Sequence, residues 1–338
     1  MSAELLRLDR ECSHAPAGSP RNVTLPFRTG SSDVSDRQFC YWRDPGARRP
    51  TLPQMDVSIV MPVLNGAASI GPQLDALYAQ RTERSWEFVL ADNGCTDETV
   101  ELASRHPISA RMKVVNASRR TSINVARNEG TRQSIGAYIC YCDADDVVSS
   151  TWIDGHAASL DHAALTTGPL DYDLLNPPTV RRPPPIVTEP MLGLGWKPFA
   201  YGANLGVRRS VFDEVGGFDE RFVLGGDDVD FSWRILLAGY ELGFAADALV
   251  HYRLKVRFRD VFRQARRYAY GDSLLYRTYH PNGVERRSTT QAARSWLRLL
   301  TRDLRLLRTL EGRSAWTWNL GTNFGRLRGS AMNRTWYP

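Results

Sequence analysis

The chain has 338 residues, of which 42% are hydrophobic and 24% charged, a composition typical of a folded protein with one large domain or two modest ones. No run approaches the roughly 18 consecutive apolar residues of a membrane-spanning helix, and the polar N-terminus lacks the apolar core of a secretory signal. The net charge of +6 is uneven, because residues 251–338 carry 19 Lys and Arg against 5 Asp and Glu. We therefore expect a cytoplasmic protein whose basic C-terminal region seeks an anionic partner.

The five cysteines fit neither a metal site nor a disulfide framework. Cys12, Cys40, Cys95, Cys140 and Cys142 are odd in number and contain no CxxC pair. Cys140 and Cys142 lie inside an apolar run, so we expect buried, reduced thiols and a reducing compartment.

The chain divides into three parts by composition. Residues 1–54 are rich in Ser, Pro, Arg and Asp and are expected to form a poorly ordered leader. Residues 55–252 alternate between strand-like and helix-like patterns, and residues 253–338 read as a basic helical extension. We expect one α/β domain between the leader and the extension.

Within the central part, elements alternate regularly. Short apolar runs rich in β-branched residues predict strands at 57–61, 88–91, 112–115 and 137–142. Apolar residues at three- and four-residue spacing predict helices at 70–77, after a cap at Thr96, at 122–134 and from Ser150. Strand–helix alternation of this kind predicts a mainly parallel central sheet flanked by helices.

The second half of the chain is less regular. Residues 171–198 include Pro177, Pro178 and Pro183 to Pro185, which exclude a regular helix or central strand, so we expect a long loop there that borders a binding site. A helix is predicted at 231–238, ended by Gly239, and an apolar segment at 242–250. Leucines and arginines on separate faces predict one amphipathic helix over about 293–310.

An acidic cluster, Asp143-Ala144-Asp145-Asp146, follows the last strand of the alternating region. Ligands of open α/β sheets bind at the carboxyl ends of strands. Mg²⁺ and Mn²⁺ take oxygen ligands, often only one or two from the protein. The cluster therefore predicts a divalent-cation site, although a solvated acidic turn before the next helix could have the same sequence. His251 follows another apolar segment and is a candidate for a further ligand.

A second pair of carboxylates, Asp227-Asp228, follows Gly225-Gly226 and opens a helix. Adjacent carboxylates repel each other, which raises the proton affinity of one of them. Such a group can accept a proton from an attacking hydroxyl. We expect Asp228 to be the base, with Asp227 beside it, although acidic residues also stabilise the first turn of any helix.

From Val57 to about His251 the chain resembles the family 2 glycosyltransferases of the GT-A fold. The resemblance rests on seven motifs in the family's order. They are Val57-Ser-Ile-Val-Met-Pro-Val-Leu-Asn65, Ala91-Asp-Asn-Gly-Cys-Thr-Asp97, Ala126-Arg-Asn-Glu-Gly130, Cys142-Asp-Ala-Asp-Asp146, Gly202-Ala-Asn-Leu-Gly-Val-Arg-Arg209, Gly216-Gly-Phe-Asp219 and Gly226-Asp-Asp-Val-Asp-Phe-Ser-Trp-Arg234.

The resemblance implies a role for each matching residue. The nucleotide-sugar would be bound by Pro62, Asn65, Asp92, Arg127, Asn128 and Asp143, with Asp92 at the base and Asp143 near the ribose. Asp145 and His251 would ligate the metal, and Asp228 would be the base of an inverting displacement. The family often has Glu-Asp where this chain has Asp227-Asp228, so the contact of Asp227 with the acceptor is expected to differ.

The expected function is thus metal-dependent, inverting transfer of a sugar from a nucleotide-diphospho-sugar, with UDP or dTDP favoured by the resemblance. The acceptor would be a glycan, a lipid-linked molecule or a small molecule. The basic extension is expected to hold the protein at the inner face of an anionic membrane, and no nucleic-acid partner is expected.

Two alternatives remain. A nucleotidyltransferase of similar fold would carry a basic residue in the loop after the first strand, and Val63-Leu-Asn-Gly-Ala-Ala68 has none. A non-catalytic sugar- or lipid-binding module would not need both Asp145 and Asp228.

Overall fold

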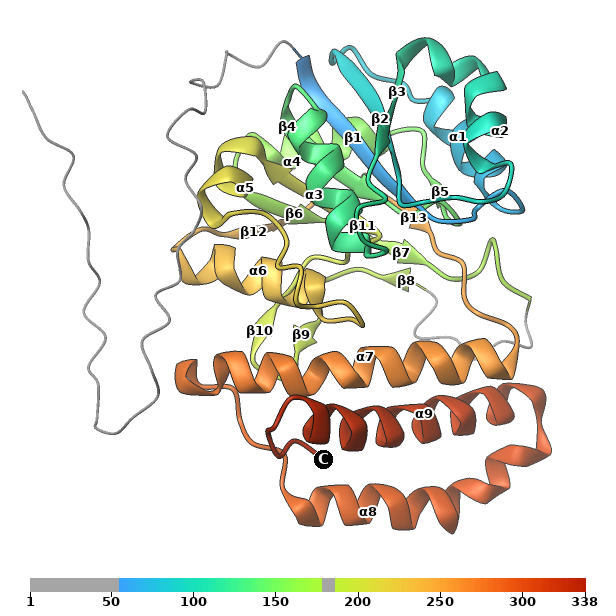
Figure 1. Cartoon of the computed structure of the whole chain (residues 1–338), viewed down its shortest axis with the longest axis vertical. Coiled ribbons are helices and arrows are strands. Elements are labelled where there is room, and N and C mark those ends of the chain that lie inside the picture. Colours follow the sequence, from blue (N-terminus) through green and yellow to red (C-terminus); the bar gives the residue numbers. More distant parts are fainter. Residues whose placement is uncertain (1–54, 178–185) are drawn as a thin grey trace, which may run out of the picture. The chain divides into compact units, whose positions relative to one another are not determined.

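A seven-stranded sheet forms the centre of the molecule in the computed structural model, which describes residues 55–177 and 186–338 (Figure 1). Of its strands only β11 runs antiparallel to its neighbours. In spatial order the strands are β12 (Leu242–Phe244), β6 (Leu165–Thr167), β11 (Asn204–Arg208), β4 (Gly136–Cys142), β1 (Met55–Val63), β2 (Trp86–Asp92) and β3 (Met112–Asn116). The predicted mainly parallel sheet is confirmed, and each strand predicted in the alternating region lies within an observed one.

Helices cover both faces of this sheet because the central strands are apolar on both sides. In β1, Val57, Ile59 and Met61 point into one core layer and Val60 into the other. The first layer also receives α1 (Ile70–Tyr78), α2 (Thr99–Arg105) and α4 (Trp152–Leu160), and the second receives α5 (Arg209–Val215) and α6 (Asp227–Leu237). Continuous burial on two faces is the pattern expected of parallel strands.

The helix α3 (Ile123–Gln133) packs closely on the sheet. A side chain at Gly130 would meet Val60 at 2.6 Å, so only glycine allows this packing. The remaining short elements are the 3₁₀ turn η1 (Pro107–Arg111), a sheet ordered β5-β13-β7-β8, and a β9–β10 pair. Their bounds are β5 (Val147–Val148), β13 (Val250–His251), β7 (Leu170–Asp171), β8 (Ile186–Val187), β9 (Leu192–Gly193) and β10 (Lys197–Pro198).

Three longer elements complete the chain: α7 (Phe258–Tyr279), α8 (Thr289–Leu300) and α9 (Leu310–Met332), with 3₁₀ turns η2 (His280–Asn282) and η3 (Arg302–Arg308). Helices α7 and α9 lie side by side along their length (Figure 1). Glycines at four-residue spacing on α9 permit this, because a side chain at Gly325 would meet the carbonyl oxygen of Arg266 at 2.4 Å. The C-terminal helices are thus present as predicted.

Two local predictions are wrong. The helix expected after a cap at Thr96 begins at Thr99 with Glu98 at the N-cap, and the Thr96 hydroxyl donates to Asn65 Oδ1 at 3.3 Å instead of capping the helix. The single amphipathic helix expected over 293–310 is broken at Thr301, whose backbone (φ −125°, ψ −82°) leaves the helical region.

Several predictions concern residues on which the structure gives partial information. The leader at 1–54 lies outside the described residues, as do residues 178–185 of the proline-rich stretch. The described parts of that stretch contain no helix and only two-residue strands. Cys140 and Cys142 are buried free thiols, Cys95 is a partly buried one, and Cys12 and Cys40 fall in the leader.

Candidate active site

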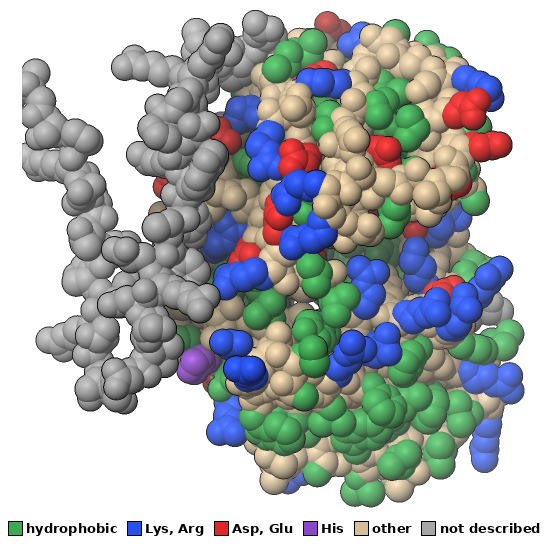
Figure 2. Space-filling model, in the orientation of Figure 1, with side chains coloured by type: hydrophobic (Ala, Val, Ile, Leu, Met, Phe, Trp, Pro, Cys, Tyr) green, Lys and Arg blue, Asp and Glu red, His purple; other side chains and the backbone are tan. Residues whose placement is uncertain are grey.

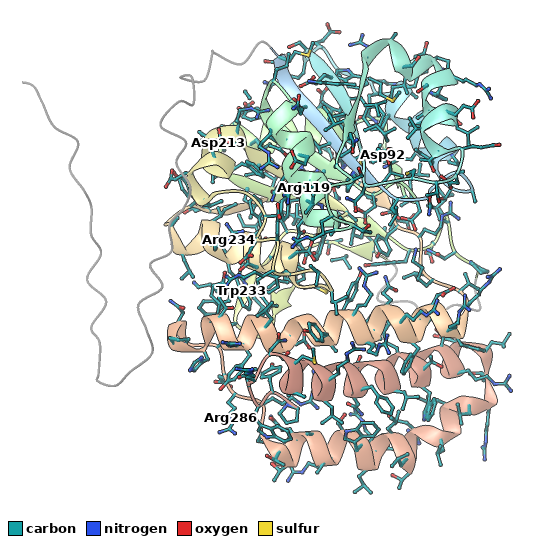
Figure 3. All side chains as sticks on the ribbon, viewed as in Figure 1. Asp92, Arg119, Asp213, Trp233, Arg234 and Arg286 are labelled. Atoms are coloured by element: carbon teal, nitrogen blue, oxygen red, sulfur yellow. The ribbon has the colours of Figure 1, made fainter. Side chains whose placement is uncertain are left out.

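The sheet topology brings the sequence motifs to one edge. The parallel strands β1 and β2 pair Val63 with Asp92, so both strands end together, and β4 ends beside them at Cys142 (Figure 3 labels Asp92 at the end of β2). β11 runs the opposite way and pairs Asn204 with Cys142, which places Gly202 at the same edge. The predicted edge of the site is therefore formed by residues that are far apart in sequence.

Three carboxylates of the Asp143–Asp146 turn face one another. Asp143, Asp145 and Asp146 each offer an oxygen, and these oxygens lie within 4.8 Å of one another. Gln73 fixes the turn, because its buried amide donates to the carbonyl oxygen of Asp143 at 3.0 Å and accepts from the backbone N–H of Val148 at 3.0 Å. We call these three carboxylates the acidic cluster.

Burial and mutual repulsion disfavour the ionised form of the carboxylates in the acidic cluster. Burial and then repulsion from Asp145 and Asp227 raise the pKa of Asp143 to about 6, although Arg127 opposes the rise. Burial and its acidic neighbours also raise the pKa of Asp146 well above its usual value. Grouped carboxylates whose charges are costly gain most from a nearby cation.

The residues of the cluster fit a hard divalent cation. All its donors are oxygens, and Asp146 Oδ2 is buried without a hydrogen-bond partner. Donor groups of the chain contact two of these carboxylates: Lys255 Nζ is 2.8 Å from Asp145 Oδ2, and the backbone N–H of Arg253 donates to Asp146 Oδ1 at 2.7 Å. Sequence reasoning missed both basic residues, which lie more than 100 positions from their partners.

The predicted ligand His251 lies next to this turn on β13, paired with Val147 of β5. Its Nδ1 contacts Asp171 Oδ2 at 2.5 Å, a contact that the sequence did not suggest. Histidine ligands commonly donate the second ring nitrogen to such a carboxylate. Among the described residues the acidic cluster itself comprises only aspartates, so the ligand role of His251 stays a prediction.

The predicted base, Asp228, lies in the first turn of α6. Its Oδ2 accepts the backbone N–H of Gly202 at 3.1 Å and its Oδ1 that of Val229 at 2.9 Å. Burial and the neighbouring Asp227 raise the pKa of Asp228 to about 6, against the lowering effect of the Gly202 N–H and of Arg127. A carboxylate with this pKa is ionised near neutral pH and can still accept a proton.

The two acidic groups are joined by the buried guanidinium of Arg127. Its Nη1 lies 2.7 Å from Asp227 Oδ2, and its Nη2 lies 3.7 Å from Asp143 Oδ1 and donates to the carbonyl oxygen of Gly202 at 3.0 Å. The two aspartates overcome the effect of burial and raise the pKa of Arg127. Arg127 therefore holds the end of β4, the start of β11 and α6 together, a task not expected for a residue beside the nucleotide.

Asn128 is also engaged with the protein. Its Nδ2 donates to the carbonyl oxygen of Phe218 and its Oδ1 accepts the N–H of the same residue, both at 2.9 Å. It therefore fixes the turn that begins at Gly216 (φ +78°). The nucleotide contact predicted for Asn128 remains a prediction.

The remaining predicted donor-site residues shape loops at the sheet edge. Pro62 pairs with Ala91 in the sheet, and Asn65 (φ +53°) accepts the N–H of Thr96. Asp92 Oδ1 accepts the N–H groups of Gly94 and Cys95 at 3.0 and 2.7 Å, which leaves Asp92 Oδ2 with no hydrogen bond recorded within the described chain. These three residues line one side of the edge where the acidic cluster forms the other.

The helix α7 packs against the loop before α6 and against α6 itself, which carries Asp228. Its Gly271 lies so close to the loop before α6 that a side chain there would meet the carbonyl oxygen of Gly225 at 2.2 Å. Tyr279 of α7 donates to Asp230 Oδ1 at 2.7 Å and packs edge-on against Trp233, which Figure 3 labels just above α7. Residues predicted to form a separate extension thus contact the base motif.

With this geometry in view, comparisons with known proteins define the class. The model of glycosyl transferase family 2 matches residues 58–216, and that of glycosyl transferase family group 2 matches residues 195–323. The chain belongs to the family 2 glycosyltransferases and has the GT-A fold.

Its relatives include glycosyltransferase AglE of Haloferax volcanii, 28% identical over 57% of this chain and 65% of that protein. The N-acetylglucosaminyl-diphospho-decaprenol L-rhamnosyltransferase of Mycobacterium tuberculosis is 29% identical over 60% of this chain and 78% of that protein. The chain thus spans less than two thirds of AglE. Among solved structures, the mannosyltransferase PcManGT from Pyrobaculum calidifontis shares the fold, with a TM-score of 0.50 and 17% identity over 83% of this chain and 76% of that one.

Proposed function

We propose that this protein transfers a sugar from a nucleotide-diphospho-sugar to an acceptor hydroxyl, with inversion at the anomeric carbon. The observation that carries the proposal is the position of Asp228. This carboxylate has a pKa of about 6 and is linked through Gly202 and Arg127 to the acidic cluster at the end of β4. A base on one side and a diphosphate site on the other are what a direct displacement needs.

In this mechanism each group of the chain has a separate task. Asp228 accepts the proton of the acceptor hydroxyl as that oxygen attacks. Asp227 is held by Arg127, which fixes the direction of the first turn of α6. Asp145, with Asp143 and Asp146 and with His251 as the proposed further ligand, would hold Mn²⁺ or Mg²⁺, which neutralises charge on the departing diphosphate.

Two basic residues near the cluster suggest a further part of the donor site. Burial opposes the charge of Lys255, but Asp145 outweighs it and raises the pKa of the ammonium. The ammonium is therefore cationic, and together with the side chain of Arg253 it would lie near the phosphates of a metal-bound nucleotide. Asp92, whose Oδ2 has no hydrogen bond within the described residues, would contact the base, as the family resemblance implies.

A donor screen tests the proposal. Nucleotide release from UDP-, dTDP- and GDP-sugars is measured with Mn²⁺, with Mg²⁺ and with a chelator. We expect turnover of one donor class that stops with the chelator, and an Asp145→Asn variant that loses both activity and Mn²⁺ binding. Full turnover by Asp145→Asn, or the same rate in chelator, would refute metal dependence.

We further propose that the acceptor is lipid-linked and that the protein meets it at an anionic membrane surface. The name of the M. tuberculosis relative specifies a diphospho-decaprenol acceptor. In this chain, apolar side chains gather over the C-terminal helices in Figure 2, with arginines around them. Between residues 297 and 310 the exposed leucines are Leu297, Leu300, Leu304, Leu307 and Leu310. We call these five residues the leucine band.

The leucine band suits an interface rather than a span. No helix in the described parts of the chain is long and apolar enough to cross a bilayer. Exposed apolar clusters on a protein surface commonly mark sites of interaction. Arg302, Arg305 and Arg308 alternate with the leucines, and each basic residue near an anionic surface contributes about 1 kcal/mol.

A further inference from the structure

A polar cavity lies between α8 and α9, outside the proposed catalytic site. Its volume is about 320 Å³. Four arginines, one glutamine and five other polar residues form its walls. They are Arg287, Gln291, Arg294, Ser295, Arg298, Asp303, Asn319, Thr322, Asn323 and Arg326.

Both helices turn polar faces toward this cavity. On α8 the lining residues Gln291, Arg294 and Arg298 follow three- and four-residue spacing, and on α9 Asn319, Asn323 and Arg326 do the same. A helix packed on its neighbours ordinarily buries its apolar stripe. On α8 that stripe includes the buried Ala292 and Leu299, whereas the cavity-lining Gln291, Arg294 and Arg298 are exposed. The polar lining is therefore not part of the packed surface of α8.

The charge of the lining is strongly positive, with four arginines against the single acidic residue Asp303. Arg298 has an acidic neighbour, Asp303 at 3.6 Å, and Arg326 has Asp272 at 3.1 Å. Arg287 and Arg294 have no hydrogen-bond or ion-pair partner within residues 55–177 and 186–338. Two cations at the rim thus lack a counter-charge from the protein.

A buried donor in the wall is also without a partner. Asn323 is only 5% exposed, its Oδ1 accepts from Ser295 Oγ at 2.7 Å, and its Nδ2 has no hydrogen-bond partner. Buried polar atoms are almost always paired, because leaving one unpaired costs free energy. An unpaired donor beside unpaired cations indicates a place for an acceptor-rich anion.

We propose that the α8–α9 cavity binds the phosphate of a phosphorylated molecule. Guanidinium groups bind phosphate through paired, charge-assisted hydrogen bonds, and the amide of Asn323 would supply a further donor. A cavity of about 320 Å³ is at the lower end of ligand-site volumes and accommodates a pyrophosphate or a phosphorylated headgroup. This site is independent of the proposed sugar transfer.

The test compares two double variants with the same change in charge. Arg287→Gln/Arg294→Gln removes the unpaired cations of the cavity. Arg286→Gln/Arg328→Gln removes two exposed arginines close by in sequence that do not line it; Figure 3 labels Arg286. Inorganic pyrophosphate is titrated calorimetrically into each full-length protein without divalent metal. Because both variants keep the catalytic site, any pyrophosphate bound there contributes equally.

We expect the cavity variant to bind pyrophosphate at least tenfold more weakly than the parent and the control variant to stay within about twofold. No binding by the parent, or equal weakening in both variants, would overturn the proposal, since equal weakening would mean diffuse attraction to the basic surface. Melting temperatures of both variants confirm that each is folded. Donor turnover should be unchanged in both, so a failure of the proposed transfer would not affect this result.

A second measurement identifies the source of the phosphate. The same variants are mixed with vesicles of phosphatidylcholine, with and without phosphatidylglycerol. If a lipid headgroup fills the cavity, the cavity variant will bind the anionic vesicles at least fivefold more weakly than the control variant. If a soluble phosphorylated molecule fills it, the two variants will bind the vesicles equally while still differing toward pyrophosphate.

Discussion

At the scale of single residues, the site depends on carboxylates that the fold keeps at an energetic cost. Asp227 and Asp228 are neighbours in the first turn of α6, and Asp143 faces them across Arg127. Burial and the nearby carboxylate of Asp227 disfavour ionisation of Asp228, which is why the pKa of Asp228 rises to about 6. Active sites commonly carry groups that serve the reaction and destabilise the fold.

This cost gives a prediction for stability. The pKa of Asp228 is higher in the folded protein (about 6) than in the unfolded chain (3.8), so folding loses stability as pH rises between these values. Two pK units correspond to about 3 kcal/mol, and partial exposure reduces the expected effect to about 1–2 kcal/mol. Asp228→Asn should therefore melt higher than the parent at pH 7.5.

The pH dependence separates this effect from a simple packing change. At pH 4, Asp228 is protonated in the folded protein and partly protonated in the unfolded chain, so the difference in melting temperature between parent and Asp228→Asn should shrink there. A stabilisation of equal size at pH 4 and pH 7.5 would contradict the account. Thermal melts monitored by circular dichroism at both pH values decide the matter.

The buried guanidinium of Arg127 makes a second prediction, for the reaction. Arg127 lowers the pKa of Asp228 through its charge, so Arg127→Met should raise that pKa and move the acidic limb of the pH–rate profile upward. Arg127→Lys keeps the charge and should move the limb less. If both variants keep the parent profile, Arg127 does not tune the base.

At the scale of elements, the close pairing of α7 with α9 rests on glycines. Gly321, Gly325 and Gly329 lie against α7, and any side chain at Gly325 would meet backbone of Arg266. Gly71 in α1 serves as a control, because it is also a helical glycine but has nothing within 4 Å of the position of an added side chain.

Substitution by alanine should therefore act oppositely at the two positions. Gly325→Ala should destabilise the protein by about 1–3 kcal/mol because it overpacks the helix pair. Gly71→Ala should stabilise it by about 0.5–1 kcal/mol, because alanine loses less backbone entropy in a helix. Urea unfolding of the two variants measures both effects, and a stabilising Gly325→Ala would show that the helices are not tightly packed.

The elements also show what sequence could predict. Strands such as 137–142 and helices such as 122–134 were predictable because apolar periodicity is a local signal. The break at Thr301 was not, since the leucine and arginine spacing continues through it while the backbone turns. Likewise, the sequence predicts that Asp145 follows the end of a strand. Its pairing with Lys255 was not predictable, because the two residues are 110 positions apart in the sequence.

The site was predictable to a similar degree. The edge that gathers Asp92, Asp143 and Asp228 follows from strand order and the family motifs. The link through Arg127, the contact of His251 with Asp171 and the use of Asn128 as a clamp do not, because each depends on which side chains meet after folding. The role of a motif residue can therefore be assigned only when its contacts in the folded protein are known.

At the scale of the whole molecule, α7 joins the acidic edge of the sheet, which we propose is catalytic, to a basic, apolar C-terminal region. Figure 2 shows the apolar side chains of this region on one face, with blue side chains near them. This arrangement suits a transferase that takes a soluble donor at one end and meets its acceptor at a lipid surface.

That arrangement predicts binding to vesicles. The full-length protein should co-sediment with vesicles that contain phosphatidylglycerol at low salt and be released at high salt, because screening weakens the arginine contribution. Leu300→Ser/Leu304→Ser should weaken binding at least fivefold without changing the charge. Binding that is unaffected by this change would assign attachment to charge alone, and no binding to anionic vesicles would refute the membrane proposal.

The central claim is that Asp228 is the base of a sugar transfer, and the most direct measurement is turnover by Asp228→Asn with donor binding measured on the same preparation. The account predicts that kcat falls by at least about a thousandfold while the Kd for the nucleotide-sugar changes less than about threefold, since the acidic cluster is intact. A variant that retains the parent kcat, or one whose loss is wholly a loss of donor binding, would contradict it.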